Sequence, residues 1–136
     1  ITNRWALWVD AGNVRFDGQL RVDQRIYSGV VALTDAATIL LDASLGNHFR
    51  VTLGGNRTLG VPTNAVDGQK ITLEIIQDGA GSRTLTLTTG STGAFISGTD
   101  IISITLTTTA SKRDLIGAVY SSSFQRWMVV SFIKGF

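Results

Sequence analysis

The chain has 136 residues, of which 43% are hydrophobic and 16% are charged, so it is long enough for one compact domain and too apolar to remain disordered. Its basic and acidic residues leave a net charge of +2 and are scattered, which excludes the concentrated basic stripe of a nucleic-acid-binding surface. Without cysteine there is no disulfide or thiolate zinc site, and no apolar run reaches the ~18 residues of a membrane-spanning helix, so we expect no membrane insertion.

The first thirty residues predict very short strands on tight turns. Hairpins this small are marginal on their own in water, so their apolar side chains need a partner surface. That surface is either the main domain or the same segment of neighbouring chains. We place a domain boundary near Ser28-Gly29, so that residues 1–29 form a β extension that anchors or trimerises the protein and residues 30–136 form the main domain. The residues expected at the oligomer or anchor interface are Trp5, Leu7, Trp8, Val14, Phe16 and Leu20.

Alternating apolar and polar residues predict strands throughout the main domain. In residues 70–75, Ile71, Leu73 and Ile75 face one way and the residues between them face the other, which is typical of a half-buried strand. Similar or shorter patterns predict strands at residues 38–42, 48–53, 84–88, 102–107, 114–120 and 127–132.

Turns rich in Gly and Asn separate these strands. One segment, residues 34–38, could form a single helical turn with Thr34 or Asp35 as its N-cap. Closely spaced strands and a lone proline predict an all-β fold, as in a sandwich or barrel. The turn signals lie at residues 45–47, 54–56, 67–68, 78–82 and 97–100.

One internal similarity joins residues 55–59 to residues 81–85. Both segments place Arg-Thr-Leu directly after a Gly-containing turn. A repeat architecture would show three or more units at a fixed period, and only two are visible. We therefore interpret the pair as two similar hairpins in one sandwich, with residues 78–82 as a hairpin turn.

Residues suited to catalysis or metal binding are sparse. His48 lies on the polar side of its strand, and no nucleophile signature accompanies it, which favours a surface histidine. Glu74 is the only glutamate, and most aspartates (Asp10, Asp17, Asp67, Asp78, Asp100) lie in or beside Gly-rich turns, which favours turn capping over a carboxylate pair for glycoside cleavage. We expect no catalytic, cofactor-binding or metal site.

The aromatic residues allow two interpretations. A sugar-stacking platform could draw on Trp5, Trp8, Tyr27, Tyr120 and Trp127. Trp127 alternates with strand residues, however, and is expected in the core. Trp5 and Trp8 are three residues apart and so point to opposite faces of a strand, which favours packing between subunits.

Two stretches resemble proteins of tailed bacteriophages. Residues 34–59, together with residues 67–69, 77–85, 107–110 and 127–130, resemble a module carried by virion and prophage proteins, and residues 134–136 resemble its natural C-terminus. Residues 4–18 resemble short β repeats of tail-fibre chains. The resemblance implies an antiparallel, jelly-roll-like β-sandwich that is trimeric and lies on the virion surface.

The function expected from this resemblance is structural and non-enzymatic. The homotrimer would bind other virion proteins of the capsid or tail, with a host-surface glycan as a further candidate partner and without nucleic acid. A tail fibre or spike and a capsid decoration protein both remain open. The alternative from another class is a carbohydrate-binding module of a bacterial enzyme or surface protein.

Overall fold

The computed structural model describes residues 11–12 and 14–136. These residues form strands, loops and one short 3-10 turn, without an α-helix. The elements are β1 (Val30–Ala32), β2 (Thr38–Ile39), η1 (Ala43–Leu45), β3 (His48–Leu53), β4 (Arg57–Leu59), β5 (Lys70–Gln77), β6 (Leu85–Leu87), β7 (Phe95–Ser97), β8 (Arg113–Ser121) and β9 (Arg126–Lys134).

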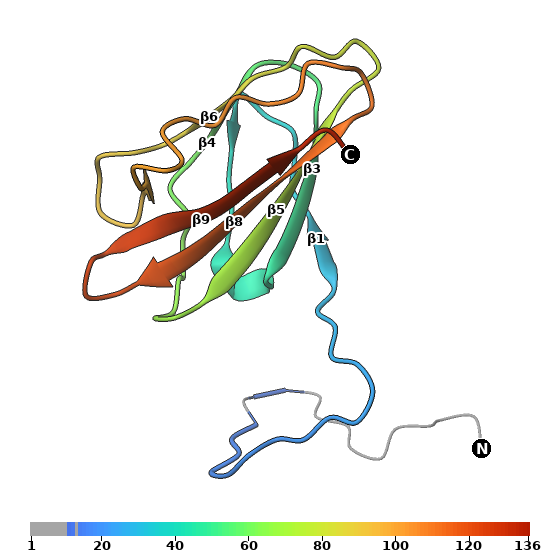
Figure 1. Cartoon of the computed structure of the whole chain (residues 1–136). Coiled ribbons are helices and arrows are strands. Elements are labelled where there is room, and N and C mark those ends of the chain that lie inside the picture. The colour runs from blue at the N-terminus through green and yellow to red at the C-terminus, as the bar shows by residue number, and fades with distance from the viewer. Residues whose placement is uncertain (1–10, 13) are drawn as a thin grey trace, which may run out of the picture.

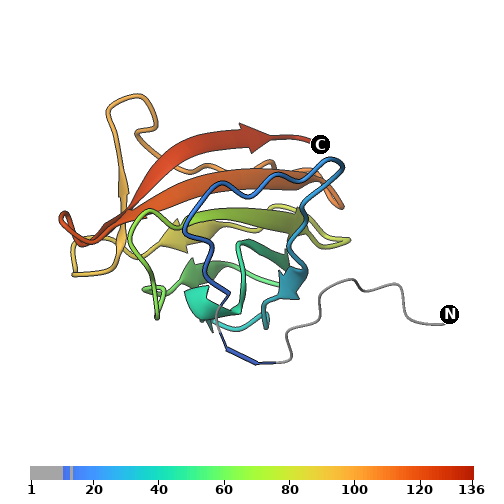
Figure 2. The same ribbon diagram turned by 90° about the horizontal axis from the view of Figure 1, so that it is seen from below.

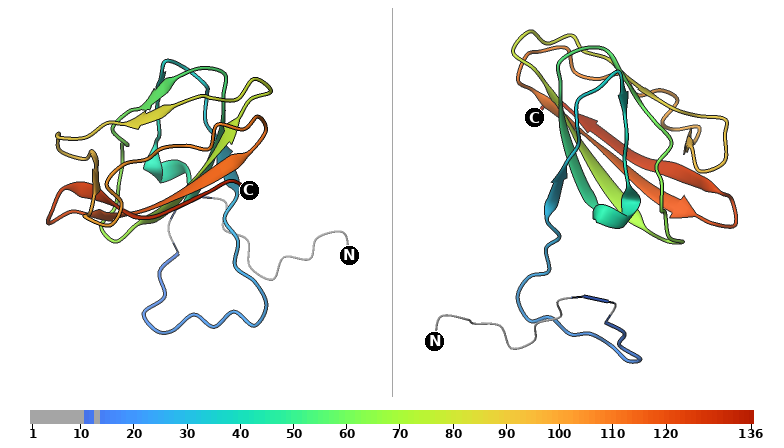
Figure 3. Two further views of the ribbon diagram at one scale, coloured as in Figure 1. Left: turned by 45° about the horizontal axis from the view of Figure 1, so that its top comes forward. Right: turned by 180° about the vertical axis from the view of Figure 1, so that it is seen from behind.

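The strands lie in two sheets that face each other. The larger sheet has six strands in the order β1-β3-β5-β8-β9-β7, and the smaller has three in the order β2-β4-β6. Figure 1 shows the larger sheet in front of the short strands, and the two layers are also apparent in the left view of Figure 3. The prediction of an all-β fold is therefore confirmed.

The strand directions differ from the prediction. From β1 to β6 the chain crosses to the other sheet after every strand, so neighbours within a sheet come from successive passes and run parallel. We call the three successive passes, β1–β2, β3–β4 and β5–β6, rungs. The purely antiparallel, jelly-roll-like sandwich is wrong, because alternation along a strand shows which face is buried but not which strand will be its neighbour.

The last part of the larger sheet is antiparallel. Strand β8 pairs antiparallel with both β5 and β9, and β7 lies parallel to β9 at the edge. The register shifts between Gly117 and Ala118, where a Cβ on Gly117 would clash with the Ser131 hydroxyl. The hairpin of β8 and β9 thus extends the larger sheet beyond the third rung.

The two Arg-Thr-Leu segments lie on adjacent rungs. Arg57 begins β4 and is the register partner of Leu85 in β6, so the two segments run side by side in one parallel sheet, two residues out of register. The turn after β5 leads to β6 in the opposite sheet. Within this turn, the Asp78 carboxylate accepts hydrogen bonds from the amides of Ala80 and Gly81. The interpretation as two hairpins, with residues 78–82 as a hairpin turn, is therefore wrong.

Most predicted strands are present. The prediction at residues 48–53 coincides with β3, and those at 70–75, 114–120 and 127–132 lie within β5, β8 and β9. Those at 38–42 and 84–88 are longer than β2 and β6. Strands β1 and β7 were not predicted, because their three residues are too few for alternation to be recognised.

Two local predictions are wrong. Residues 102–107 form no strand: Leu106 is buried, but the Thr107 amide donates to the carboxylate of Asp114 rather than to a neighbouring strand. Residues 34–38 form no helical turn. The 3-10 turn η1 lies later, after Asp42, whose carboxylate accepts from the Ser44 amide.

The core lies between the two sheets. Trp127 is fully buried, which confirms its predicted place, and its ring lies 5.3 Å from that of Tyr120 between centroids. Burial of each large apolar side chain contributes about 1.5–3 kcal/mol. The largest fully buried apolar side chains are Trp127, Phe49, Phe95, Ile39, Leu41, Leu53, Leu59, Leu73 and Ile116.

The turn between β5 and β6 provides a test of the rung arrangement. Gly81 has φ +68°, and a Cβ there would lie 2.5 Å from the Thr108 carbonyl oxygen, whereas Gly79 has open space. We expect Gly81→Ala to lower the free energy of unfolding by about 1–3 kcal/mol. The matched control, Gly79→Ala, should change it by no more than about 0.5 kcal/mol. Urea unfolding followed by tryptophan fluorescence measures both, and equal effects would contradict the packing of this turn.

Candidate functional site

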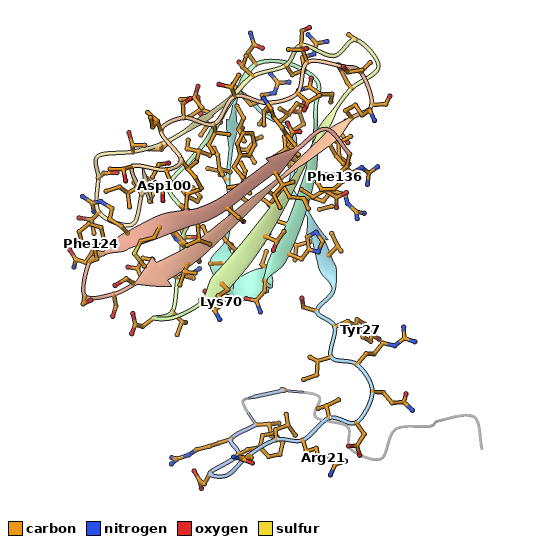
Figure 4. All side chains as sticks on the ribbon, in the orientation of Figure 1. Arg21, Tyr27, Lys70, Asp100, Phe124 and Phe136 are labelled. Atoms are coloured by element: carbon orange, nitrogen blue, oxygen red, sulfur yellow. The ribbon has the colours of Figure 1, made fainter. Side chains whose placement is uncertain are left out.

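The N-terminal segment, residues 14–29, lies outside the β domain. It forms no strand, and each of its residues is exposed. Its apolar side chains Val14, Phe16 and Leu20 are 48%, 54% and 59% exposed. Figure 4 shows the segment below the domain, with Arg21 and Tyr27 projecting from it. The predicted interface residues Val14, Phe16 and Leu20 are therefore accessible, whereas Trp5, Leu7 and Trp8 lie outside the described residues.

The N-terminal segment separates apolar from charged positions. Val14 and Phe16 form one apolar pair, and Leu20 and Val22 form another, with a bend at residues 17–18 between them. Within each short stretch, an extended backbone places both members of the pair on one side. Odd positions carry two exposed ion pairs, Arg15 with Asp17 and Arg21 with Asp23. Such exposed pairs contribute at most about 1 kcal/mol each, so they do not fix the segment. Its apolar side is thus available to a partner.

An apolar groove of about 510 Å³ lies at the first rung, and no sequence pattern predicted it. Strands β1 and β2 stand first in their sheets, so among the described residues each has one unpaired edge. Leu40 and Leu45, which line the groove, are 76% and 64% exposed. We call this feature the first-rung groove. It is lined by Val31, Ala32, Leu33, Thr34, Ala36, Thr38, Leu40, Leu41, Asp42, Leu45, Val61 and Thr63.

A charged cluster occupies the outer face of the larger sheet. The Glu74 side chain on β5 is only 6% exposed, although its position faces outward. Its carboxylate accepts hydrogen bonds from Arg50 Nε on β3, at 2.7 Å, and from Arg113 Nη1 on β8. His48 Nε2 lies 3.5 Å from the same carboxylate. Three neighbouring strands are therefore joined through the only glutamate of the chain.

The electrostatics of this cluster favour a carboxylate that is charged near neutral pH. Burial is the largest influence on the pKa of Glu74 and raises it. The hydrogen bonds and positive charges of Arg50 and Arg113 together outweigh burial, so the pKa lies below its ordinary value. A general acid for glycoside cleavage needs a raised pKa instead. The arrangement is thus suited to holding strands together.

Several aspartates hold turns together. Asp78 accepts from amides of its own turn and also pairs with Arg83, which confirms the predicted turn capping at this position. Asp35 accepts from both Arg57 Nε and Nη2, at 2.7 and 2.8 Å, and so joins the first rung to the second. Hydrogen bonding to Arg57 lowers the pKa of Asp35, so the pair stays charged near neutral pH.

The described residues contain no group of three or more His, Asp or Glu side chains arranged to hold a metal ion. No helix among them is long and apolar enough to cross a membrane. Trp127 is sealed in the core and cannot take part in a sugar-stacking platform. Tyr27 is 79% exposed and remains available for such contact.

The Glu74 cluster generates a pH prediction. Because its folded pKa is lowered, Glu74 stabilises the protein fully above its unfolded pKa, and this contribution is lost as pH falls through the folded pKa. We expect Glu74→Gln to cost about 1–3 kcal/mol at pH 7, less than a fully buried pair because both arginines are partly exposed. The difference in the free energy of unfolding between Glu74→Gln and the unsubstituted protein should shrink as pH falls below about 4.5.

Urea unfolding at several pH values between about pH 3 and pH 7 measures the pH dependence of this cost, because the range spans the titration of carboxylates. Lys70→Gln is the control, since Lys70 is exposed on the same strand and the same side. If Glu74→Gln lowered the free energy of unfolding equally at every pH tested, the charge of Glu74 would not be the source of its stabilising effect.

No family model, curated protein or solved structure matches this chain.

Proposed function

We propose that the protein is a non-enzymatic structural module of a tailed-phage virion surface, which assembles as a homotrimer and binds neighbouring virion proteins. The motifs at residues 34–59 and 4–18 support the phage assignment. The arrangement of the described residues supports assembly, because a β domain carries an extended apolar segment that it does not cover.

The single observation that carries the proposal is the exposure of the N-terminal segment. Soluble monomers rarely leave contiguous apolar surface in water without a binding role. Val14, Phe16 and Leu20 are each about half exposed on a segment that lies away from the domain. Full burial of such a side chain contributes about 1.5–3 kcal/mol, and a trimer would repeat the gain in each subunit. Self-association is therefore the simplest use of this surface.

The charged cluster supports a structural role over catalysis. Both oxygens of Glu74 are engaged by arginines, and its lowered pKa opposes proton donation near neutral pH. The cluster lies on a sheet face, and Glu74 lines neither the first-rung groove nor the smaller pockets around residues 85–104. Glu74 thus stabilises the domain that the assembly displays.

Binding by such a module would depend on multivalency. A trimer presents three copies of each surface, so weak contacts reinforce one another through effective concentration. A tail fibre and a capsid decoration protein would both use this principle. Electron microscopy of intact particles distinguishes them, because a decoration protein lies at capsid symmetry positions and a fibre lies at the tail.

Light scattering of the purified chain tests the proposal. We expect a trimer, and we expect the double variant Trp5→Ser, Phe16→Ser to be monomeric because it loses two of the apolar side chains predicted at the interface. Val66→Ser is the matched control, since Val66 is 68% exposed on a loop of the domain. A monomeric parent chain would overturn the proposal, and a trimeric double variant would remove the N-terminal segment from the interface.

A glycan array tests the alternative of a carbohydrate-binding module. We expect the trimer to show no binding that depends on the exposed aromatic Tyr27 or on Trp5 and Trp8. Binding that is abolished by Tyr27→Ala, Trp5→Ala or Trp8→Ala, with the oligomer intact, would favour the carbohydrate-binding module.

A further inference from the structure

We propose that the first-rung groove is the docking site for the N-terminal segment of a second copy of this chain, whose residues 14–22 add parallel strands to the free edges of β1 and β2. The proposal rests on the self-assembly proposed above and identifies the contact that produces it. It assigns a defined place to the apolar side of the N-terminal segment.

The spacing of the N-terminal segment matches that of a rung. Its apolar pair at residues 14 and 16 is separated by three residues from the pair at 20 and 22. In the second rung, β3 and β4 are likewise separated by three residues, 54–56. Seven residues, 23–29, then lead to β1, much like the eight residues, 40–47, that lead from β2 to β3. The segment therefore has the length and layout of one more rung.

A single register aligns the apolar residues of the segment with inward-facing residues at the first rung in both sheets. An offset of 17 residues places Val14 beside Val31 and Phe16 beside Leu33, and it places Val22 beside Ile39. Val31 and Leu33 are partly buried against the core and line the groove, and Ile39 is fully buried, so all three point between the sheets. The offset between β1 and β3 is similar, 18 residues from Val30 to His48.

In this register the charges of the segment face water. Residues on an extended strand alternate between faces, so Arg15, Asp17, Arg21 and Asp23 lie opposite the apolar residues. Their ion pairs within the segment stay exposed and need no partner on the domain. Docking therefore buries apolar side chains without drawing a charge of the segment out of water.

The domain itself is incomplete at this edge. Stacked rungs need their ends covered, because an end rung leaves apolar side chains and backbone groups without neighbours. Beyond the third rung, β8 and β9 continue the larger sheet. At the first rung, no described strand covers β1 or β2, and Leu40 and Leu45 remain exposed. An added strand would supply main-chain hydrogen bonds as well as apolar cover.

The donor is a second copy because the segment leaves its own domain. It departs from the start of β1 and lies beyond the end of the sheets, as Figure 1 and the right view of Figure 3 show. In Figure 2, which views the molecule from below, the segment passes in front of the domain, and each residue from 14 to 29 is exposed. Donation from each chain to the next is a head-to-tail contact, which closes into a ring when the rotation allows, as in a trimer.

Disulfide cross-linking of the full chain tests whether the N-terminal segment of one chain docks in the first-rung groove of another. The chain has no cysteine of its own, so the introduced thiols are its only ones. In the double variant Phe16→Cys, Leu33→Cys the two thiols would face each other on adjacent parallel strands, within the distance that a disulfide spans. We expect oxidation to give covalent dimers and trimers on a non-reducing gel, which a reductant converts to single chains. The control, Phe16→Cys with Lys70→Cys, places the second thiol at an exposed site outside the groove lining and should give none.

Any other outcome overturns the proposed docking between chains. Disulfides formed only within single chains would show that the segment docks on its own domain. Absent cross-links in a chain that light scattering finds trimeric would place the interface elsewhere and leave the proposed assembly standing. Absent cross-links together with a monomeric unsubstituted chain would overturn both proposals.

Discussion

The structure depends on the burial of apolar side chains between two sheets that the chain visits alternately. Phe49 in β3 and Leu59 in β4 belong to consecutive strands of one rung, yet they meet the core from opposite sheets. Hydrogen bonds join each strand to the strand one rung away, so the core and the sheets grow together with every pass. This constraint explains the parallel pairing within the three rungs, because each of their passes through a given sheet runs in the same direction.

Polar side chains join the rungs where the apolar core cannot. Arg57 reaches back to Asp35 of the preceding rung, and Glu74 gathers Arg50 and Arg113 from the strands on either side. Arginine suits these positions because its planar group can donate to both oxygens of a carboxylate. The only glutamate of the chain therefore links neighbouring strands, and the two arginines that it binds lower the pKa of Glu74.

A stack of rungs has two ends, and the ends differ. The antiparallel hairpin of β8 and β9 follows the third rung, whereas the first rung presents the free edges of β1 and β2 with exposed Leu40. The same chain carries an uncovered segment immediately before β1. An uncovered sheet edge and an uncovered apolar segment in one molecule are complementary, and the proposed assembly follows from satisfying both at once.

The sequence by itself determined the β class, the strands at β3, β5, β8 and β9, the buried place of Trp127 and the apolar character of the N-terminal segment, because alternation and composition are local properties. Only the tertiary structure decided which strands are neighbours. The two Arg-Thr-Leu segments resembled hairpins, although Arg57 and Leu85 are partners in a parallel sheet. The first-rung groove and the Glu74 cluster likewise depend on residues that are far apart in sequence. Alternation records which face of a strand is buried, and it carries no information about the strand that lies beside it.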